Sequence, residues 1–247
     1  MRIAILGGTG RIGGHVLNWA LDAGYPVTAL ARRPEALRQA ALAQGGRRQE
    51  ERGQAARDHE APGREARGAD ALVAAALSPA AGLTVVRGDA LDQTAVAEVI
   101  AGADAVISAL GPRGEKTSGL LAGAASNIVS AMQQTGARRL ICVSAAGAFI
   151  TGDPDMSWLV RQILPRVFAK PFADVRRMED VIRESGLDWT LVRATRLVNG
   201  PRTGQYRVSP YYPPRGGGKI SRADVAHFIA AALTGDGWPR SAPALAY

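Results

Sequence analysis

The chain has 247 residues, 47% of them hydrophobic, with a formal net charge of +8 and one cysteine. This length and apolar content are enough for one sizeable core, so we expect a single domain over residues 1–247. The basic charge raises the question of nucleic acid, but no zinc-finger, basic-zipper or RNA-binding aromatic motif accompanies it, and no apolar run reaches membrane-spanning length. Neither a nucleic acid nor a membrane is therefore expected as a partner.

The one cysteine, Cys142, lies in an apolar run, which indicates a small buried side chain. A disulfide framework is excluded, and a reducing compartment suits the chain, so we expect a cytoplasmic location. No grouping of His, Cys and carboxylate residues has the spacing of metal ligands, so no metal site is predicted.

Strand and helix patterns alternate along the sequence. Runs rich in Val, Ile and Leu predict strands at 2–6, 25–32, 83–88, 104–110, 138–144 and 188–193. Helical patterns occupy residues 11–23, 35–43, 94–100, 118–135, 175–184 and 222–233, the last capped by Ser221. Apolar strands interleaved with helices are buried on both faces, so the fold class is α/β, a doubly wound parallel sheet with helices on both faces.

Residues 44–70 break this alternation. They contain almost no large apolar side chain, and their six arginines offset six acidic residues. Such a segment buries too little surface to offset its ordering entropy, so we predict a mobile surface insertion. A partner-binding arm is the alternative interpretation.

A glycine-rich turn follows the first predicted strand. Gly7, Gly10 and Gly13 form G-x-x-G-x-x-G at the opening of a helix. The first glycine allows a sharp turn, the second removes a Cβ that would collide with a pyrophosphate, and the third lets helix and strand pack closely. The helix N-terminus then offers free N–H groups to phosphates, which predicts a dinucleotide site. The predicted cofactor-binding residues of this loop are Gly7, Thr9, Gly10, Arg11, Ile12 and Gly13.

The end of the second predicted strand favours NADP over NAD. Arg32 and Arg33 stand where an acid would otherwise accept hydrogen bonds from the ribose diol, and guanidinium groups fork well onto a 2′-phosphate. One or both arginines being merely solvated is the alternative. Asp89 and Ala90 follow the third strand, near the expected adenine. Small residues after the fourth strand suit close approach of the cofactor, and the positions predicted there are Ala109, Leu110 and Gly111.

Several motifs of the sequence together resemble those of one protein family. The chain carries, in order, the motifs ILGGTGRIG, VRGDALD, AVISALGP, ICVSAAGA, ESGLDWTLVRATRL, TGQYRV and ISRADVA. Their order resembles that of the atypical short-chain dehydrogenase/reductases with NAD(P)H-binding, NmrA-like domains, and among these the flavin reductase and biliverdin-IXβ reductase branch. The resemblance implies a Rossmann-like sheet, a small C-terminal substrate region and reduced nicotinamide as the cofactor.

One departure from the wider family bears on mechanism. Its classical members use Ser, Tyr and Lys, the tyrosine donating a proton. Ser144 ends the fifth predicted strand in the matching place, but no tyrosine occurs between it and Tyr206. Counting back from ESGLDWT puts Pro171 and Val175 at the Tyr-x-x-x-Lys positions. The sequence therefore predicts that this acid–base pair is absent.

Without that pair, acceptors that delocalise the incoming electrons are favoured, because their protonation can come from solvent. We predict an NADPH-dependent reductase of a planar conjugated small molecule, such as a flavin or quinone. Ser144 would orient the acceptor or the nicotinamide, or else form only a strand-end hydrogen bond. The substrate region is expected within residues 145–215, where packing onto the core is the alternative role of the aromatic side chains. The predicted substrate contacts are Phe149, Trp158, Thr195 and Arg196.

A second function stays open from sequence. A redox sensor that binds NADP(H) and acts through a protein partner would also lack the acid–base pair, and NmrA-like resemblance permits it. Clustered aromatic residues favour the enzyme, whereas the charged insertion would suit a partner surface. Arg193 is expected to anchor the end of the sixth strand, and Tyr206 to belong to a short strand.

Overall fold

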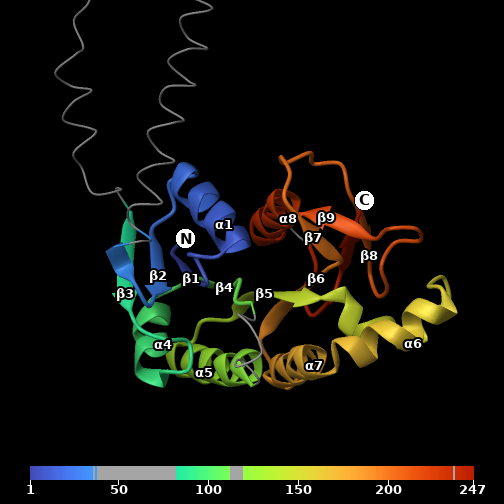
Figure 1. The fold of residues 1–247 in the computed structure, drawn as a ribbon. Coiled ribbons are helices and arrows are strands. Elements are labelled where there is room, and N and C mark those ends of the chain that lie inside the picture. The colour runs from blue at the N-terminus through green and yellow to red at the C-terminus, as the bar shows by residue number, and fades with distance from the viewer. Residues whose placement is uncertain (36, 38–81, 112–118, 236) are drawn as a thin grey trace, which may run out of the picture.

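The computed structural model describes residues 1–35, 37, 82–111, 119–235 and 237–247. The predicted insertion at 44–70 and nearly all of the helix predicted at 35–43 lie outside them. The described strands form an eight-stranded sheet in the order β3-β2-β1-β4-β5-β6-β10-β8 (Figure 1). Their bounds are β1 Ile3–Leu6, β2 Val27–Ala31, β3 Leu83–Arg87, β4 Ala105–Ser108, β5 Arg139–Ala145, β6 Asp188–Ala194, β8 Arg207–Ser209 and β10 Ala244–Ala246.

All pairs in this sheet are parallel except β10 with β8. The doubly wound α/β fold class is therefore confirmed, with one antiparallel edge strand added. Two short strands, β7 (Arg196–Val198) and β9 (Lys219–Ser221), make a separate parallel pair. These short strands and β10 carry too few residues for periodicity to reveal them.

Helices cover both faces of the sheet (Figure 1). One layer holds α4 (Gln93–Ile100), α5 (Leu120–Thr135) and α7 (Ala169–Glu184), and the other holds α1 (Arg11–Asp22) and α8 (Arg222–Thr234). Alternate residues of β5 enter the two cores: Leu140 and Cys142 face the α5–α7 layer, while Ile141 lies in the α1–α8 layer. Ser144 lies two residues after Cys142 on β5, so its side chain points to the same face of the sheet, toward α7.

The helix predicted at 175–184 is longer in the structure, where α7 runs from Ala169 to Glu184. Two further helical segments join it to β5: a 3-10 helix, η2 (Ala146–Gly152), and α6 (Trp158–Val167). In Figure 1, α6 lies at the margin of the molecule, beyond the end of α7.

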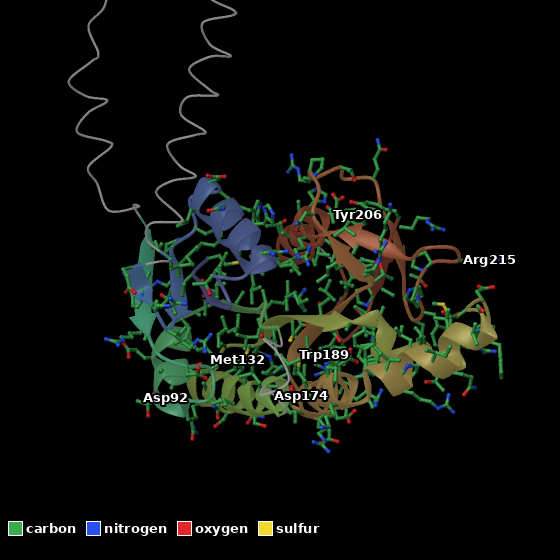
Figure 2. The ribbon with its side chains drawn as sticks, in the orientation of Figure 1. Asp92, Met132, Asp174, Trp189, Tyr206 and Arg215 are labelled. Atoms are coloured by element: carbon green, nitrogen blue, oxygen red, sulfur yellow. The ribbon has the colours of Figure 1, made fainter. Side chains whose placement is uncertain are left out.

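Two buried carboxylates, Asp174 and Asp224, bind backbone groups at or near helix ends. Asp174 of α7 accepts hydrogen bonds from the backbone N–H groups of Leu121 (3.0 Å) and Ala122 (3.2 Å), so a side chain of α7 caps the N-terminus of α5 (Figure 2). The predicted cap of α8 is confirmed, since the Ser221 hydroxyl accepts from the Asp224 N–H at 3.0 Å.

Asp224 itself is fully buried and binds the loop that precedes β8. Burial alone would raise its pKa, but hydrogen bonds from the Tyr247 hydroxyl, the Gly204 N–H and the hydroxyl and N–H of Thr203 lower that pKa to about 2. The carboxylate therefore stays charged through the neutral range and fixes this loop to the start of α8.

Candidate functional site

The strand order reverses direction between β1 and β4. Chain connections run outward from this point on both sides, and in open α/β sheets ligands bind outside the carboxyl ends of the strands at such a switch point. The glycine-rich loop follows β1 here, and residues 109–111 follow β4 beside it. The predicted cofactor loops are thus neighbours.

At two positions of the loop, the space available admits only glycine. Gly7 has φ +87°, and a Cβ on it would lie 2.6 Å from the carbonyl oxygen of Ala109. A Cβ on Gly13 would overlap the Gly7 carbonyl group. Gly10 donates its N–H to the Gly7 carbonyl oxygen at 2.8 Å, which closes the turn. Gly13 therefore lets the helix pack closely against the loop that follows β1, whereas the sequence predicts close packing of helix and strand.

The N-terminus of α1 is open to an anion. Its N-cap, Gly10, has no side chain to accept the first N–H groups, and no acidic residue lies in the first turn. Ile12 is buried in the core, so only its backbone faces this end. Thr9 and Arg11 are exposed, and an Arg11 Nη1 lies 3.5 Å from the side-chain oxygen of Asn199. A cradle made of N–H groups, glycine and one guanidinium fits a pyrophosphate.

Exposed cations mark the end of β2. Arg32 and Arg33 are both exposed, and the Arg32 Nε lies 4.0 Å from a carboxylate oxygen of Asp89 at the end of β3. The Asp89 carboxylate also accepts the N–H of Leu91 at 3.0 Å. Ala90 is buried against the α4 core. The structure thus brings the predicted 2′-phosphate and adenine residues side by side.

The segment after β4 is small and close to the glycine loop. Ala109 donates its N–H to the Leu6 carbonyl oxygen at 2.9 Å, which continues the pairing of β4 with β1. A Cβ on Gly111 would meet nothing within 4 Å, so this residue borders open space. Leu110 packs partly against the core.

Ser144 belongs to a buried polar cluster. Its hydroxyl donates to a carboxylate oxygen of Glu179 at 2.6 Å. Glu179 is fully buried on α7, and Arg193 at the end of β6 grips the carboxylate with two hydrogen bonds, of 3.1 Å and 2.7 Å. Arg183 adds a third contact at 2.9 Å. One carboxylate thus holds one hydroxyl and two guanidinium groups.

The cluster continues into the predicted substrate region. The guanidinium of Arg193 stacks 3.6 Å from the ring centre of Phe149, and it also donates to the backbone oxygen of Tyr211 at 3.4 Å. Arg193 therefore anchors the end of its strand as expected, and also links Ser144 to Phe149 through Glu179.

Glu179 is the residue that sequence reasoning missed. It sits next to Met178 and four positions after Val175, both of which are buried, and so it occupies a core-facing position of α7. A carboxylate at an apolar position of a helix demands a buried partner, and this was the available signal.

The other predicted substrate residues lie apart from this cluster. Trp158 is 67% exposed at the start of α6. The Thr195 hydroxyl donates to the Leu245 carbonyl oxygen at 2.9 Å and so serves the pairing with β10. Arg196 is exposed on β7. The structure therefore joins only Phe149 to Ser144, through the Glu179–Arg193 pair.

Two further groups have raised pKa values. Burial raises the pKa of the Cys142 thiol to about 12, so it stays protonated, and its predicted role as a small buried side chain is confirmed. Burial and the nearby Asp224 raise the pKa of Tyr206 to about 12, and its hydroxyl lies 2.9 Å from His227 Nδ1. Tyr206 packs against the α1–α8 core, on the opposite side of the sheet from Asp174 and α7 (Figure 2).

Within the described ranges, no three His, Cys, Asp or Glu side chains gather in a way that could bind a metal ion. The helices of the same ranges include none with both the length and the apolar character needed to cross a bilayer.

Solved structures with the same fold cover nearly the whole chain. ChuY, an anaerobillin reductase from Escherichia coli O157:H7, is 20% identical, with a TM-score of 0.69 over 100% of this chain and 97% of its own. A wide-type short-chain dehydrogenase/reductase from Veillonella parvula, solved in complex with NADP, is 21% identical, with a TM-score of 0.69 over 100% and 94%. A Rossmann-fold NAD(P)-binding family protein from Shigella flexneri is 21% identical, with a TM-score of 0.65 over 99% and 92%.

The model of the NAD(P)H-binding family matches residues 67–236, from before β3 to the end of α8. The matched range includes the ends of β3, β4, β5 and β6, where the residues described above gather. The glycine-rich loop after β1 lies before that range, so its geometry is an observation independent of the family match. This chain belongs to the NAD(P)H-binding family and has the Rossmann-like fold that its resemblance to the atypical short-chain dehydrogenase/reductases predicts.

Proposed function

We propose that this chain is an NADPH-dependent reductase of a planar conjugated acceptor, such as a flavin, a quinone or a tetrapyrrole. One observation carries the acceptor class. The polar partner of Ser144 is Glu179, held by two guanidinium groups, while Val175, which the count along the sequence assigns to the place of the classical lysine, is buried in the core. A carboxylate gripped in this way accepts hydrogen bonds and donates no proton, which favours acceptors that take their proton from solvent.

The chain's own residues would bind and orient the cofactor. The N-terminus of α1 and the glycine loop hold the pyrophosphate, and Arg32 and Arg33 hold the 2′-phosphate. When bound, the reduced nicotinamide supplies a hydride. The end of β5 then positions the acceptor in a site bounded by Ser144 and Phe149.

Ser144 would act as a hydrogen-bond acceptor in this site. A hydroxyl has one hydrogen, and that of Ser144 is directed to Glu179 at 2.6 Å. Only lone pairs remain for a ligand, so Ser144 is suited to an N–H group of the carboxamide or of a nitrogen-containing acceptor. The name of ChuY as an anaerobillin reductase supports a reductase, although that likeness extends to the fold alone.

Loss of NADPH absorbance tests the proposal directly. Purified protein is added to NADPH with FMN, riboflavin, quinones and biliverdin-like tetrapyrroles in turn, with NADH in parallel. Protein-dependent oxidation that prefers NADPH supports the reductase. Tight NADPH binding without turnover on any acceptor would contradict it and favour the sensor that acts through a protein partner.

Coenzyme preference is expected to depend on the two arginines after β2. Replacing both, Arg32→Ala with Arg33→Ala, should weaken NADPH binding about 10- to 100-fold, since a charge-assisted hydrogen bond contributes about 1.5–3 kcal/mol. NADH binding should change by less than about threefold, because NADH has no 2′-phosphate to lose contact with. Titration of cofactor fluorescence measures both affinities.

A matched control removes the same charge elsewhere. Arg138 and Arg177 are also exposed, the former at the opposite end of β5 from Ser144 and the latter on α7. The Arg138→Ala, Arg177→Ala protein should bind both coenzymes normally. Equal losses for NADPH and NADH in the Arg32, Arg33 variant would show that these residues do not select the phosphate.

A further inference from the structure

The α6 helix presents large apolar side chains to solvent. The exposed large apolar residues of the described chain concentrate in 158–168, where Trp158 is 67%, Leu159 55%, Ile163 49% and Val167 68% exposed. None of the ten residues of α6 is buried. Packing onto the core, the alternative expected from sequence for this aromatic segment, therefore fails for α6. Exposed patches of this kind mark interaction surfaces.

The exposed residues form one continuous stripe. At about 100° per residue, Leu159, Val160, Ile163 and Val167 fall within a sector about 100° wide. A stripe of that width normally faces a protein core, whereas here it faces outward. The opposite side of the helix is the attached one: Arg161 donates to the Asp153 carbonyl oxygen at 3.0 Å, and Leu164 lies against Gly147 of η2.

Cations accompany the stripe. Arg166 is exposed next to the stripe and also donates a hydrogen bond to the Gln162 side chain at 2.8 Å, and Lys170 is exposed in the first turn of α7. Residues 158–170 contain no Asp or Glu. The whole chain carries a net charge of +8. An apolar face with a Trp at its start and Arg or Lys along its edge is the pattern of a helix that lies in the surface of a negatively charged bilayer.

The position of α6 suits a flat partner. The helix is at the margin of the molecule, beyond α7 (Figure 1), so its outward face can meet an extended surface. A second copy fits less well, because each copy carries a net charge of +8 and like charges oppose self-association.

We propose that the α6 stripe of Leu159, Val160, Ile163 and Val167, together with Arg166 beside it, Trp158 at the start of the helix and Lys170 in the first turn of α7, binds this protein to the surface of anionic lipid bilayers. The contact is peripheral and reversible, with the apolar side chains in the headgroup region and the cations at the lipid phosphates. A membrane partner is not expected from the sequence, because no apolar run reaches membrane-spanning length. The exposure of the stripe overturns that expectation, and the proposed membrane contact does not depend on the reductase activity.

Vesicle sedimentation tests the proposal. The full chain is mixed with phosphatidylcholine vesicles that contain either no anionic lipid or about 30 mole per cent phosphatidylglycerol. We expect about tenfold or greater preference for the anionic vesicles, lost in high salt, since each surface cation contributes about fivefold. Fluorescence of Trp158, by far the most exposed tryptophan, should shift to the blue on binding.

Two variants separate the apolar and charged parts. Ile163→Gln with Val167→Gln keeps helix propensity and should lower vesicle binding about tenfold or more, given the apolar area removed. Arg166→Gln with Lys170→Gln should remove the preference for anionic lipid. The control Leu91→Gln removes an equally exposed apolar side chain (54%) between β3 and α4 and should bind like the parent. Thermal unfolding verifies that each variant is folded.

Three outcomes would overturn the proposal. Vesicle binding equal in parent and stripe variant would place the contact elsewhere. No binding to vesicles, with a concentration-dependent dimer in sedimentation velocity that Ile163→Gln with Val167→Gln disrupts, would make the occupant a second copy. No binding and a monomer at all concentrations would leave an acidic protein as the occupant, and the bilayer would be wrong.

Discussion

Gly13→Ala should disable the cofactor cradle. The new methyl carbon would overlap the Gly7 carbonyl group, and neither can rotate away, because the Cβ is fixed to the helix backbone and the carbonyl belongs to the loop backbone. We expect a loss of about 2–3 kcal/mol in the free energy of unfolding, as for overpacked sites. Displacement of the loop should weaken NADPH binding about 30- to 100-fold, the equivalent of about 2–3 kcal/mol. Urea unfolding and a cofactor titration measure the two effects.

The adjacent glycine provides a control within the same turn of helix. A Cβ on Gly14 would lie 3.6 Å from the Gly8 carbonyl oxygen, which is ordinary van der Waals contact. Because alanine is the better helix former, Gly14→Ala should stabilise the protein by about 0.5–1 kcal/mol and leave NADPH affinity unchanged. If Gly13→Ala also bound NADPH normally, the loop geometry described here would not be that of the cofactor site.

Glu179→Gln is expected to have the largest effect on stability. Its carboxylate neutralises Arg193, whose side chain is only 5% exposed, and a neutral amide would leave that guanidinium charge buried without a counter-ion. Removing one partner of a buried ion pair costs about 3–5 kcal/mol. We therefore expect a fall of about 3 kcal/mol in the free energy of unfolding, measured in urea at neutral pH.

The same helix supplies the control. Glu184 is exposed at the end of α7, so Glu184→Gln should alter the free energy of unfolding by less than about 0.5 kcal/mol. Ser144→Ala removes only the hydroxyl and should leave most of the stability, because Arg193 and Arg183 still bind the carboxylate. A Glu179→Gln protein as stable as Glu184→Gln would mean that the buried pair contributes little.

Local signals were enough to predict the glycine-rich turn, the six longer strands and the cap of α8. The glycine spacing, the apolar strands and the Ser221 cap depend on residues close together in sequence, and each was recovered within a few positions. The buried polar cluster at the end of β5 could not be predicted in this way, because Ser144 and Glu179 are 35 residues apart and meet only after α7 packs.

The C-terminal part was harder for a related reason. The β10 strand has three residues and gains its partners from β6 and β8 through tertiary contact alone. The outward apolar face of α6 has the periodicity of a core-facing helix, and periodicity states which residues share a face without stating where that face points. The pairing of β10 and the direction of the α6 face both depend on how these elements pack against the rest of the molecule.

The place of β10 between β6 and β8 has a consequence for biosynthesis. A ribosome completes β6 roughly 50 residues before β10, which is a few seconds of translation. During that interval the hydrogen-bonding edge of β6 beyond residue 192 has no strand beside it, and β8 has no place in the sheet because its neighbour there is β10. The nascent chain therefore exposes an apolar strand edge that a chaperone could protect, and the sheet is completed only after residues 244–246 emerge.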